Sequence, residues 1–139
     1  MTRQPADRHR TSANRIQSFR FAFNGWQTLF RNTPNARIQA AIAVGAVALG
    51  IWLQISPQEW AIVFLSMGVV FAAESFNTAI EAIVDLTSPD VNALAKVAKD
   101  VSAGGVLFTA IASVLVGLVI FGPALIMKIG EIFVRVQGK

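Results

Sequence analysis

Residues 59–85, EWAIVFLSMGVVFAAESFNTAIEAIVD, form an apolar segment that carries polar side chains along one side of its second half. These polar residues are Glu74, Asn77, Glu81 and Asp85, and the last three stand at offsets of 3, 7 and 11 from the first. At about 3.6 residues per turn, the four positions fall within an arc of roughly 80° on a helix. The segment therefore predicts a membrane-crossing helix with an acidic stripe on one face.

The acidic stripe is unfavourable inside a membrane, because a charged side chain at the bilayer centre costs about 2.5–3.5 kcal/mol on insertion scales. Counted from Trp60 at about 1.5 Å per residue, Glu74 lies roughly 21 Å into a hydrocarbon layer about 30 Å thick. Glu81 and Asp85 then reach the headgroups on the far side. An acid at the depth of Glu74 indicates a functional role, whereas Asp85 alone is more simply a solvated helix end.

Composition places the chain among membrane proteins. Hydrophobic residues make up 54% of its 139 residues, charged residues make up 14%, and the mean hydropathy is +0.55. A small soluble domain needs a more polar surface than this composition provides. Apolar stretches at about 35–53, 59–85 and 100–123 are each long enough to cross a layer that takes about 20 helical residues. The predicted fold is an all-α membrane protein with three transmembrane helices.

The residues before the first span divide into a tail and a helix. Residues 1–13 have no periodicity and predict a mobile basic tail. In residues 14–32, Phe19, Phe23 and Trp26 recur at helical spacing among polar residues, which predicts an amphipathic helix at the membrane interface. The alternative, a span too short and polar to cross, gives the same location. Residues 14–139 are expected to form a single membrane domain.

The distribution of basic residues predicts the orientation of the chain. Seven arginines precede or open the first span, and Lys96 and Lys99 lie between the second and third spans. The turn at residues 54–58 has no basic residue. The positive-inside rule then places the N-terminus and the 86–100 loop in the cytoplasm, as in a multi-pass protein of the plasma or inner membrane. Three basic residues near the C-terminus conflict with this orientation, but the other nine outnumber them.

The acids of the stripe suggest two kinds of chemistry. Glu81 and Asp85 stand one helical turn apart at a wet interface, where carboxylate oxygens suit a hard cation such as Mg²⁺. Glu74 is deeper, where a partly desolvated carboxyl can act as a general base toward a hydroxyl.

Three further residues have weaker signals. Asn77 either orients a carboxylate or is a packing contact between helices, and its chemistry favours neither reading. Lys99 and Asp100, at the start of the third span, can bind a phosphate and a nucleotide hydroxyl, although an isolated Lys-Asp pair is usually surface charge. The N-terminal arginines are most simply membrane-surface charges, so no nucleic-acid partner is expected.

Residues 72–89, AAESFNTAIEAIVDLTSP, and residues 94–107, LAKVAKDVSAGGVL, resemble the signature of the small prokaryotic diacylglycerol kinase family, which includes undecaprenol kinases. The pattern E-x-x-N-x-A-x-E-x-x-x-D followed by A-K-D carries the resemblance, which extends from about Arg15 to the end of the third span. It implies a homotrimer of three-span subunits that uses ATP with Mg²⁺ to phosphorylate a membrane lipid alcohol.

The resemblance also implies roles for individual residues. By motif position Glu74 is the general base on the lipid hydroxyl and Glu81 is a metal ligand, with Asn77 and Asp85 in support. The expected ATP contacts are Arg15, Glu81, Asp90, Val91, Asn92, Lys99 and Asp100. The expected lipid-substrate contacts are Glu74, Phe19, Phe23 and Trp26.

The sequence departs from the family pattern at three positions. Thr33 stands where the family usually has a second metal-binding Glu, Gln39 where it usually has His or Glu, and Asn92 where it usually has His. The matching N-terminal arginine is Arg15, although a shift of one residue would place Asn14 there. Metal occupancy or nucleotide preference is therefore expected to differ from the family pattern.

The leading functional prediction is phosphorylation of diacylglycerol to phosphatidic acid, with undecaprenol as the alternative acceptor. A non-enzymatic oligomeric proton or cation pathway would also use Glu74 and Glu81, but residues 61–73 offer only Ser66 as a polar group across the outer half. A third interpretation is an assembly subunit whose acids pair with arginines of a partner.

Overall fold

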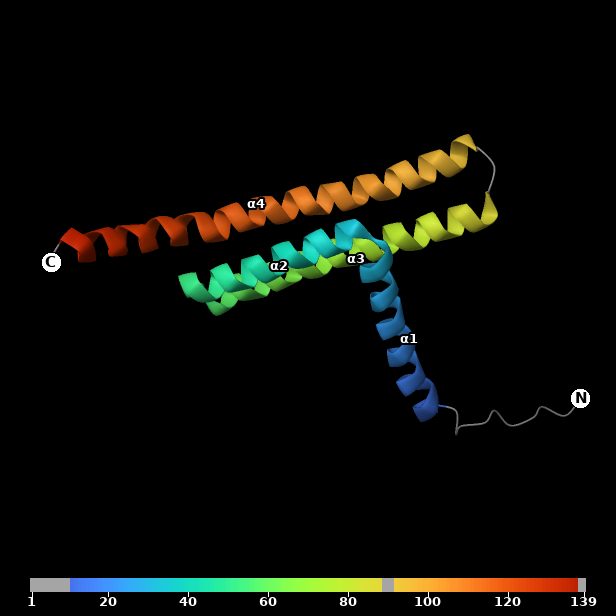
Figure 1. Cartoon of the computed structure of the whole chain (residues 1–139), viewed down its shortest axis with the longest axis horizontal. Coiled ribbons are helices and arrows are strands. Elements are labelled where there is room, and N and C mark those ends of the chain that lie inside the picture. Colours follow the sequence, from blue (N-terminus) through green and yellow to red (C-terminus); the bar gives the residue numbers. More distant parts are fainter. Residues whose placement is uncertain (1–10, 89–91, 138–139) are drawn as a thin grey trace, which may run out of the picture. The chain divides into compact units, whose positions relative to one another are not determined.

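Four helices make up the part of the chain that the structure describes. The computed structural model describes residues 11–88 and 92–137, with side chains from residue 17 onward. The helices are α1 (Thr11–Asn32), α2 (Pro34–Leu53), α3 (Pro57–Thr87) and α4 (Ala93–Gln137), as Figure 1 shows. The chain divides into two compact units, the first ending at Pro34 and the second beginning at Asn35.

The all-helical prediction with three candidate spans is confirmed. Helices α2, α3 and α4 are each long and apolar enough to cross a membrane. Helix α3 exceeds its predicted range of 59–85 by two residues at each end. Helix α2 has its predicted range to within one residue. These agreements follow from the length of the apolar segments, which is a local property of the sequence.

Helix α4 is much longer than the predicted span of 100–123. It begins at Ala93 because the Asn92 side chain caps it, accepting from the backbone N–H groups of Leu94 at 2.8 Å and Ala95 at 3.3 Å. It also continues through Pro123 to Gln137, beyond the end of the predicted span at residue 123. The neighbouring turns of a long helix hold the chain even where proline removes one hydrogen bond.

Helix α1 belongs to the first unit. Phe19, Phe23 and Trp26 are all more than half exposed, and the Trp26 ring meets the Phe30 ring edge to face with centroids 6.4 Å apart. The interfacial location of this helix stays a prediction. The predicted tail lies mostly outside the described residues, because α1 begins at Thr11.

The turn between α2 and α3 is held by side-chain and backbone hydrogen bonds. Ser56 and Glu59 form a capping box at the start of α3: the Glu59 N–H donates to Ser56 Oγ at 3.3 Å, and the Ser56 N–H donates to Glu59 Oε2 at 2.7 Å. At the end of α2, Gln54 adopts a positive φ of 57°, and the Ile55 N–H donates to the Gly50 carbonyl at 3.2 Å.

A small apolar core fixes this end of the second unit. Leu53, Ile55 and Val63 from the hairpin pack with Ile120 of α4, and Trp60 packs against them. Helix α4 runs alongside α3 (Figure 1), with a hydrogen bond of 2.9 Å between the Ser66 and Ser113 hydroxyls. This core holds the first residues of α3. The acidic second half of α3 lies at the other end of the helix, beside the first turns of α4.

Gly50 should be intolerant of any side chain. A Cβ at this position would lie 2.8 Å from Cη2 of Trp60, whose ring cannot retreat freely because it stacks on Phe64. We expect Gly50→Ala to lower the free energy of unfolding by about 1–3 kcal/mol, as overpacked sites do. Thermal unfolding in detergent micelles measures the change.

Gly45→Ala is the matched control, because a Cβ there has open space around it. Both variants gain the same helix propensity, so a lower midpoint for Gly50→Ala alone isolates the clash. Equal midpoints for the two variants would contradict the close approach of Trp60.

Candidate functional site

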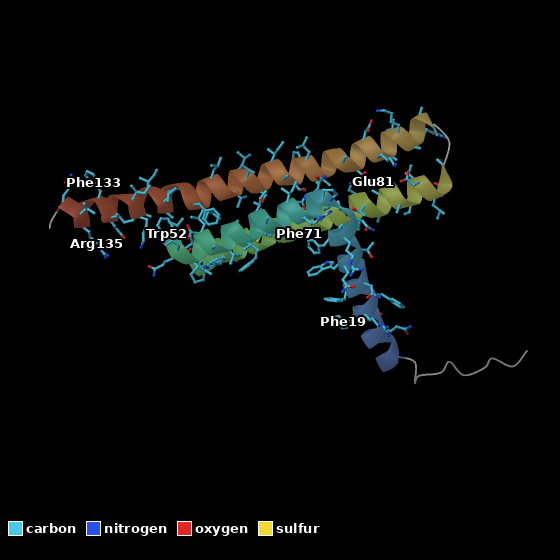
Figure 2. All side chains as sticks on the ribbon, in the orientation of Figure 1. Phe19, Trp52, Phe71, Glu81, Phe133 and Arg135 are labelled. Carbon is cyan, nitrogen blue, oxygen red and sulfur yellow. The ribbon has the colours of Figure 1, made fainter. Side chains whose placement is uncertain are left out.

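The acidic stripe of α3 runs from a buried end to an exposed end. Glu74 is fully buried and Asn77 is 8% exposed, whereas the Asp85 side chain is 66% exposed. Glu81 lies between these extremes, and Figure 2 shows it far from Trp52, which marks the hairpin end. The stripe thus crosses from an environment without water to one with water along a single helix.

Glu74 is held by a side chain from α2. The Gln39 amide donates through Nε2 to Glu74 Oε2 at 3.1 Å. Among the described residues, the other oxygen of each side chain, Glu74 Oε1 and Gln39 Oε1, is buried and has no hydrogen-bond partner. Buried acceptors normally have a donor, so these two oxygens are acceptors that the described residues leave unsatisfied.

A second hydrogen-bonded group joins α3 to α4 closer to the exposed end. The Asn77 amide donates through Nδ2 to Glu81 Oε1 at 3.1 Å. Its own oxygen, Oδ1, accepts from the Ser102 hydroxyl at 2.6 Å. One oxygen of Glu81 is therefore oriented by a side chain that is itself held from the neighbouring helix.

The first turns of α4 supply the cations of the site. Lys99 Nζ donates to Asp85 Oδ1 of α3 at 2.5 Å, and Lys96 Nζ donates to Asp100 Oδ2 within α4 at 2.5 Å. Lys99 precedes the apolar run that begins at Val101.

The structure brings four of the predicted site residues together. Asn77 bonds Glu81 within α3, and Lys99 of α4 bonds Asp85 of α3. Ser102 contacts both Asn77 and the Lys99 carbonyl, whereas Glu74 has its own partner deeper in the second unit. Asp100 pairs with Lys96 and Asn92 caps α4, both at the same end of that helix.

The other predicted site residues have no described contact with Asn77, Glu81, Asp85 or Lys99. Asp90 and Val91 lie outside the described residues, as does the Arg15 side chain. Phe19, Phe23 and Trp26 belong to α1 in the first unit, and their contact with a lipid substrate stays a prediction.

Sequence reasoning missed Ser102 and the contact of Gln39. Ser102 lies three residues after Lys99, about one turn along the same helix. A serine at that offset from a site lysine is a signal that could have been used. Gln39 gave no such signal, because its partner Glu74 is 35 residues away in the sequence.

The carboxylates of the stripe are the groups of this site that suit Mg²⁺. In the ranges that the structure covers, no group of three or more His, Cys, Asp or Glu side chains lies close enough to enclose a metal ion. Mg²⁺ is commonly bound by one or two carboxylates, several waters and the phosphates of a substrate. Glu81, with Asp85 one turn away, fits an ion that arrives with a nucleotide rather than one held by the protein alone.

An apolar groove of about 360 Å³ lies between α2, α3 and α4. Gln39 stands at one end of it and Leu49 and Phe121 at the other. Leu49 is the tenth residue after Gln39 in α2, which corresponds to about 15 Å along the helix. The groove is lined by Ile42, Ala43, Ala46, Val63, Ser66, Met67, Val70, Phe71, Ala110, Ser113, Val114, Val116 and Gly117 besides those three residues.

The chain is similar to known lipid kinases over most of its length. The sequence profile of the family described as prokaryotic diacylglycerol kinase matches residues 20–121. A protein of Bacillus subtilis (strain 168) named undecaprenol kinase is 42% identical over 119 residues, which cover 84% of this chain and 96% of the relative. A protein of Synechocystis sp. named diacylglycerol kinase is 37% identical over 114 residues, covering 81% of this chain and 65% of the relative.

The contact between Gln39 and Glu74 should be measurable as a coupling energy. We expect Gln39→Leu to destabilise the protein by about 1–3 kcal/mol, because a buried carboxylate then loses its donor. In a Glu74→Met background the same change should cost much less. A double-mutant cycle on thermal unfolding measures the difference. Equal costs of Gln39→Leu in both backgrounds would show that the two side chains do not interact.

Proposed function

From the premise that this chain belongs to the prokaryotic diacylglycerol kinase family, and is therefore a lipid kinase, we propose that it transfers the γ-phosphate of ATP to the hydroxyl of diacylglycerol. The observation that carries the proposal is the buried carboxylate of Glu74. One of its oxygens is held by Gln39, and the other is without a partner among the described residues.

The geometry supports Glu74 as the general base. A lipid hydroxyl that donates to Oε1 satisfies an acceptor that is otherwise unpaired, and that hydrogen bond is the path for proton transfer. In the reaction the lipid oxygen forms a bond to the γ-phosphorus, the bond from that phosphorus to the ADP oxygen breaks, and the hydroxyl proton goes to Glu74.

The nucleotide end of the reaction fits the exposed half of the stripe. Glu81 and Asp85 would hold Mg²⁺ together with the phosphates, and the ion would neutralise charge on the transferring group. Lys96 and Lys99, on the first turns of α4, offer positive charge to the same phosphates. Arg15, Asp90, Val91, Asn92 and Asp100 complete the proposed ATP contacts.

The apolar groove is the proposed seat of the lipid chain. It begins at Gln39, which contacts Glu74, and its walls are almost entirely apolar. A hydrocarbon chain lying in it would leave its polar head beside the general base. Phe19, Phe23 and Trp26 of α1 are proposed as further lipid contacts.

Undecaprenol is a second candidate acceptor, because the Bacillus subtilis relative that this chain matches over 96% of the relative's length is named undecaprenol kinase. Both acceptors present a primary hydroxyl on an apolar body, so the same base serves either. The proposed assembly is a homotrimer in the inner membrane with the site facing the cytoplasm, supported by the family resemblance and by the distribution of basic residues.

The first test is phosphate transfer from ATP to each lipid by purified protein in mixed micelles. We expect turnover with diacylglycerol, and we expect Glu74→Gln to lower it by about 10²–10⁴-fold, since the base is lost while the shape is kept. Glu131→Gln serves as the control, because this exposed acid pairs with Lys128 at the other end of α4. Transfer to undecaprenol but not to diacylglycerol would show that undecaprenol is the acceptor. Transfer that persists in Glu74→Gln would show that Glu74 is not the general base.

The groove has a separate test in the lipid dependence of the rate. Ala43→Phe places a ring in the groove, and we expect about a 10-fold rise in the apparent KM for a long-chain lipid, the equivalent of about 1.4 kcal/mol. The KM for ATP should not change. Val44→Phe is the control, because Val44 is exposed and lies outside the groove. Equal effects of both variants on the KM for the lipid would show that the hydrocarbon chain of the lipid does not lie in this groove.

A further inference from the structure

We propose that Ser102 is a positioning residue that fixes the amide of Asn77 and thereby holds the carboxylate of Glu81 in the orientation that binds a divalent metal with the nucleotide. This inference rests on the proposed function, because it gives Glu81 the role of metal ligand. Ser102 contacts no acid itself among the described residues, so its influence passes through Asn77.

The hydroxyl of Ser102 has two acceptors within reach. Its Oγ lies 2.6 Å from Asn77 Oδ1 and 3.0 Å from the Lys99 carbonyl oxygen of its own helix. A hydroxyl has one proton to donate, and the distance to Asn77 is the one typical of a strong O–H···O bond. Ser102 therefore donates its hydroxyl proton chiefly to Asn77 Oδ1 of α3.

The direction of this contact follows from the charge on Glu81. A carboxylate only accepts hydrogen bonds, so the Asn77 group that faces Glu81 at 3.1 Å must be the NH₂ group. The amide oxygen then faces Ser102, and Ser102 must donate. If the amide turned over, its oxygen would face the Glu81 carboxylate, which is repulsive. The order Ser102 to Asn77 to Glu81 is thus fixed from donor to final acceptor.

Burial makes the hydroxyl hard to replace. Asn77 is 8% exposed, so water has little access to its amide oxygen. With alanine at position 102 that oxygen keeps no donor among the described residues, and the amide is free to leave the orientation that serves Glu81. Loss of an outer partner that orients a metal ligand typically weakens metal affinity by about 10–100-fold.

The chain contains a matched control for this substitution. Ser113 also lies on α4 and also makes a hydrogen bond across to α3, at 2.9 Å to Ser66, but it stands 11 residues away from Ser102. Ser102→Ala and Ser113→Ala therefore remove the same kind of helix-to-helix contact. Only the first is connected to the acids. Ser113 lines the apolar groove, so its variant is a control for metal binding measured without lipid and not for lipid turnover.

The experiment is a titration of Mn²⁺ in the presence of a non-hydrolysable ATP analogue, followed by the electron paramagnetic resonance signal of free Mn²⁺. We expect Ser102→Ala to raise the apparent Kd for Mn²⁺ by about 10-fold or more. Ser102→Thr keeps the hydroxyl and should bind within about 3-fold of the wild type. Ser113→Ala should bind as the wild type does, and thermal unfolding of each variant shows that it is folded.

The outcomes separate the inference from its premise. Ser102→Ala binding Mn²⁺ as the wild type does, or Ser113→Ala weakening binding equally, would overturn the inference while the wild type still binds metal with nucleotide. If Ser102→Ala fails to fold, Ser102→Val is compared with Ser102→Thr, because these side chains have nearly the same shape and only threonine keeps the hydroxyl: weaker Mn²⁺ binding by Ser102→Val alone supports the role of the hydroxyl, and equal affinities overturn it. Wild-type protein that neither binds Mn²⁺ with the analogue nor phosphorylates a lipid would overturn the proposed function and this inference together.

Discussion

The second unit depends on one constraint: the polar side chains of the α3 stripe need partners within the protein, because an apolar medium offers none. Glu74 meets this need with Gln39 of α2, Asn77 with Ser102 of α4, and Asp85 with Lys99 of α4. These contacts determine how the acidic half of α3 sits against its neighbours. A displacement of α4 along α3 would break two of the contacts at once.

The opposite end of the unit is held by different forces. There the capping box of Ser56 and Glu59 fixes the turn, and Trp60 closes against Gly50 without any charged partner from α4. The helices are therefore positioned by apolar packing at one end and by hydrogen bonds at the other. Apolar packing at the hairpin end stabilises the second unit, and this stability offsets the cost of burying the Glu74 side chain near the other end of α3.

The same gradient suits a reaction between a substrate in the membrane and one in water. Glu74 is fully buried, Glu81 is half-buried and Asp85 is mostly exposed, so one helix face offers three environments in order. A lipid kinase must join a hydroxyl that stays with its apolar chain to a phosphate that stays hydrated. Under the proposed function, a helix that passes from one medium to the other would bring the two substrates together without either being fully transferred.

The sequence by itself determined the three apolar helices, the hairpin at Ser56 and the acidic stripe of α3, because apolar length, capping residues and helical spacing are local properties. It did not predict that α4 continues through Pro123, since the tolerance of a proline depends on the helix around it. Only the tertiary structure decided which side chains meet. Gln39 and Glu74 are 35 residues apart, and Asn77 and Ser102 are 25 apart, so no periodicity links either pair. Their contact comes from the packing of three helices, which the spacing of residues along one helix cannot encode.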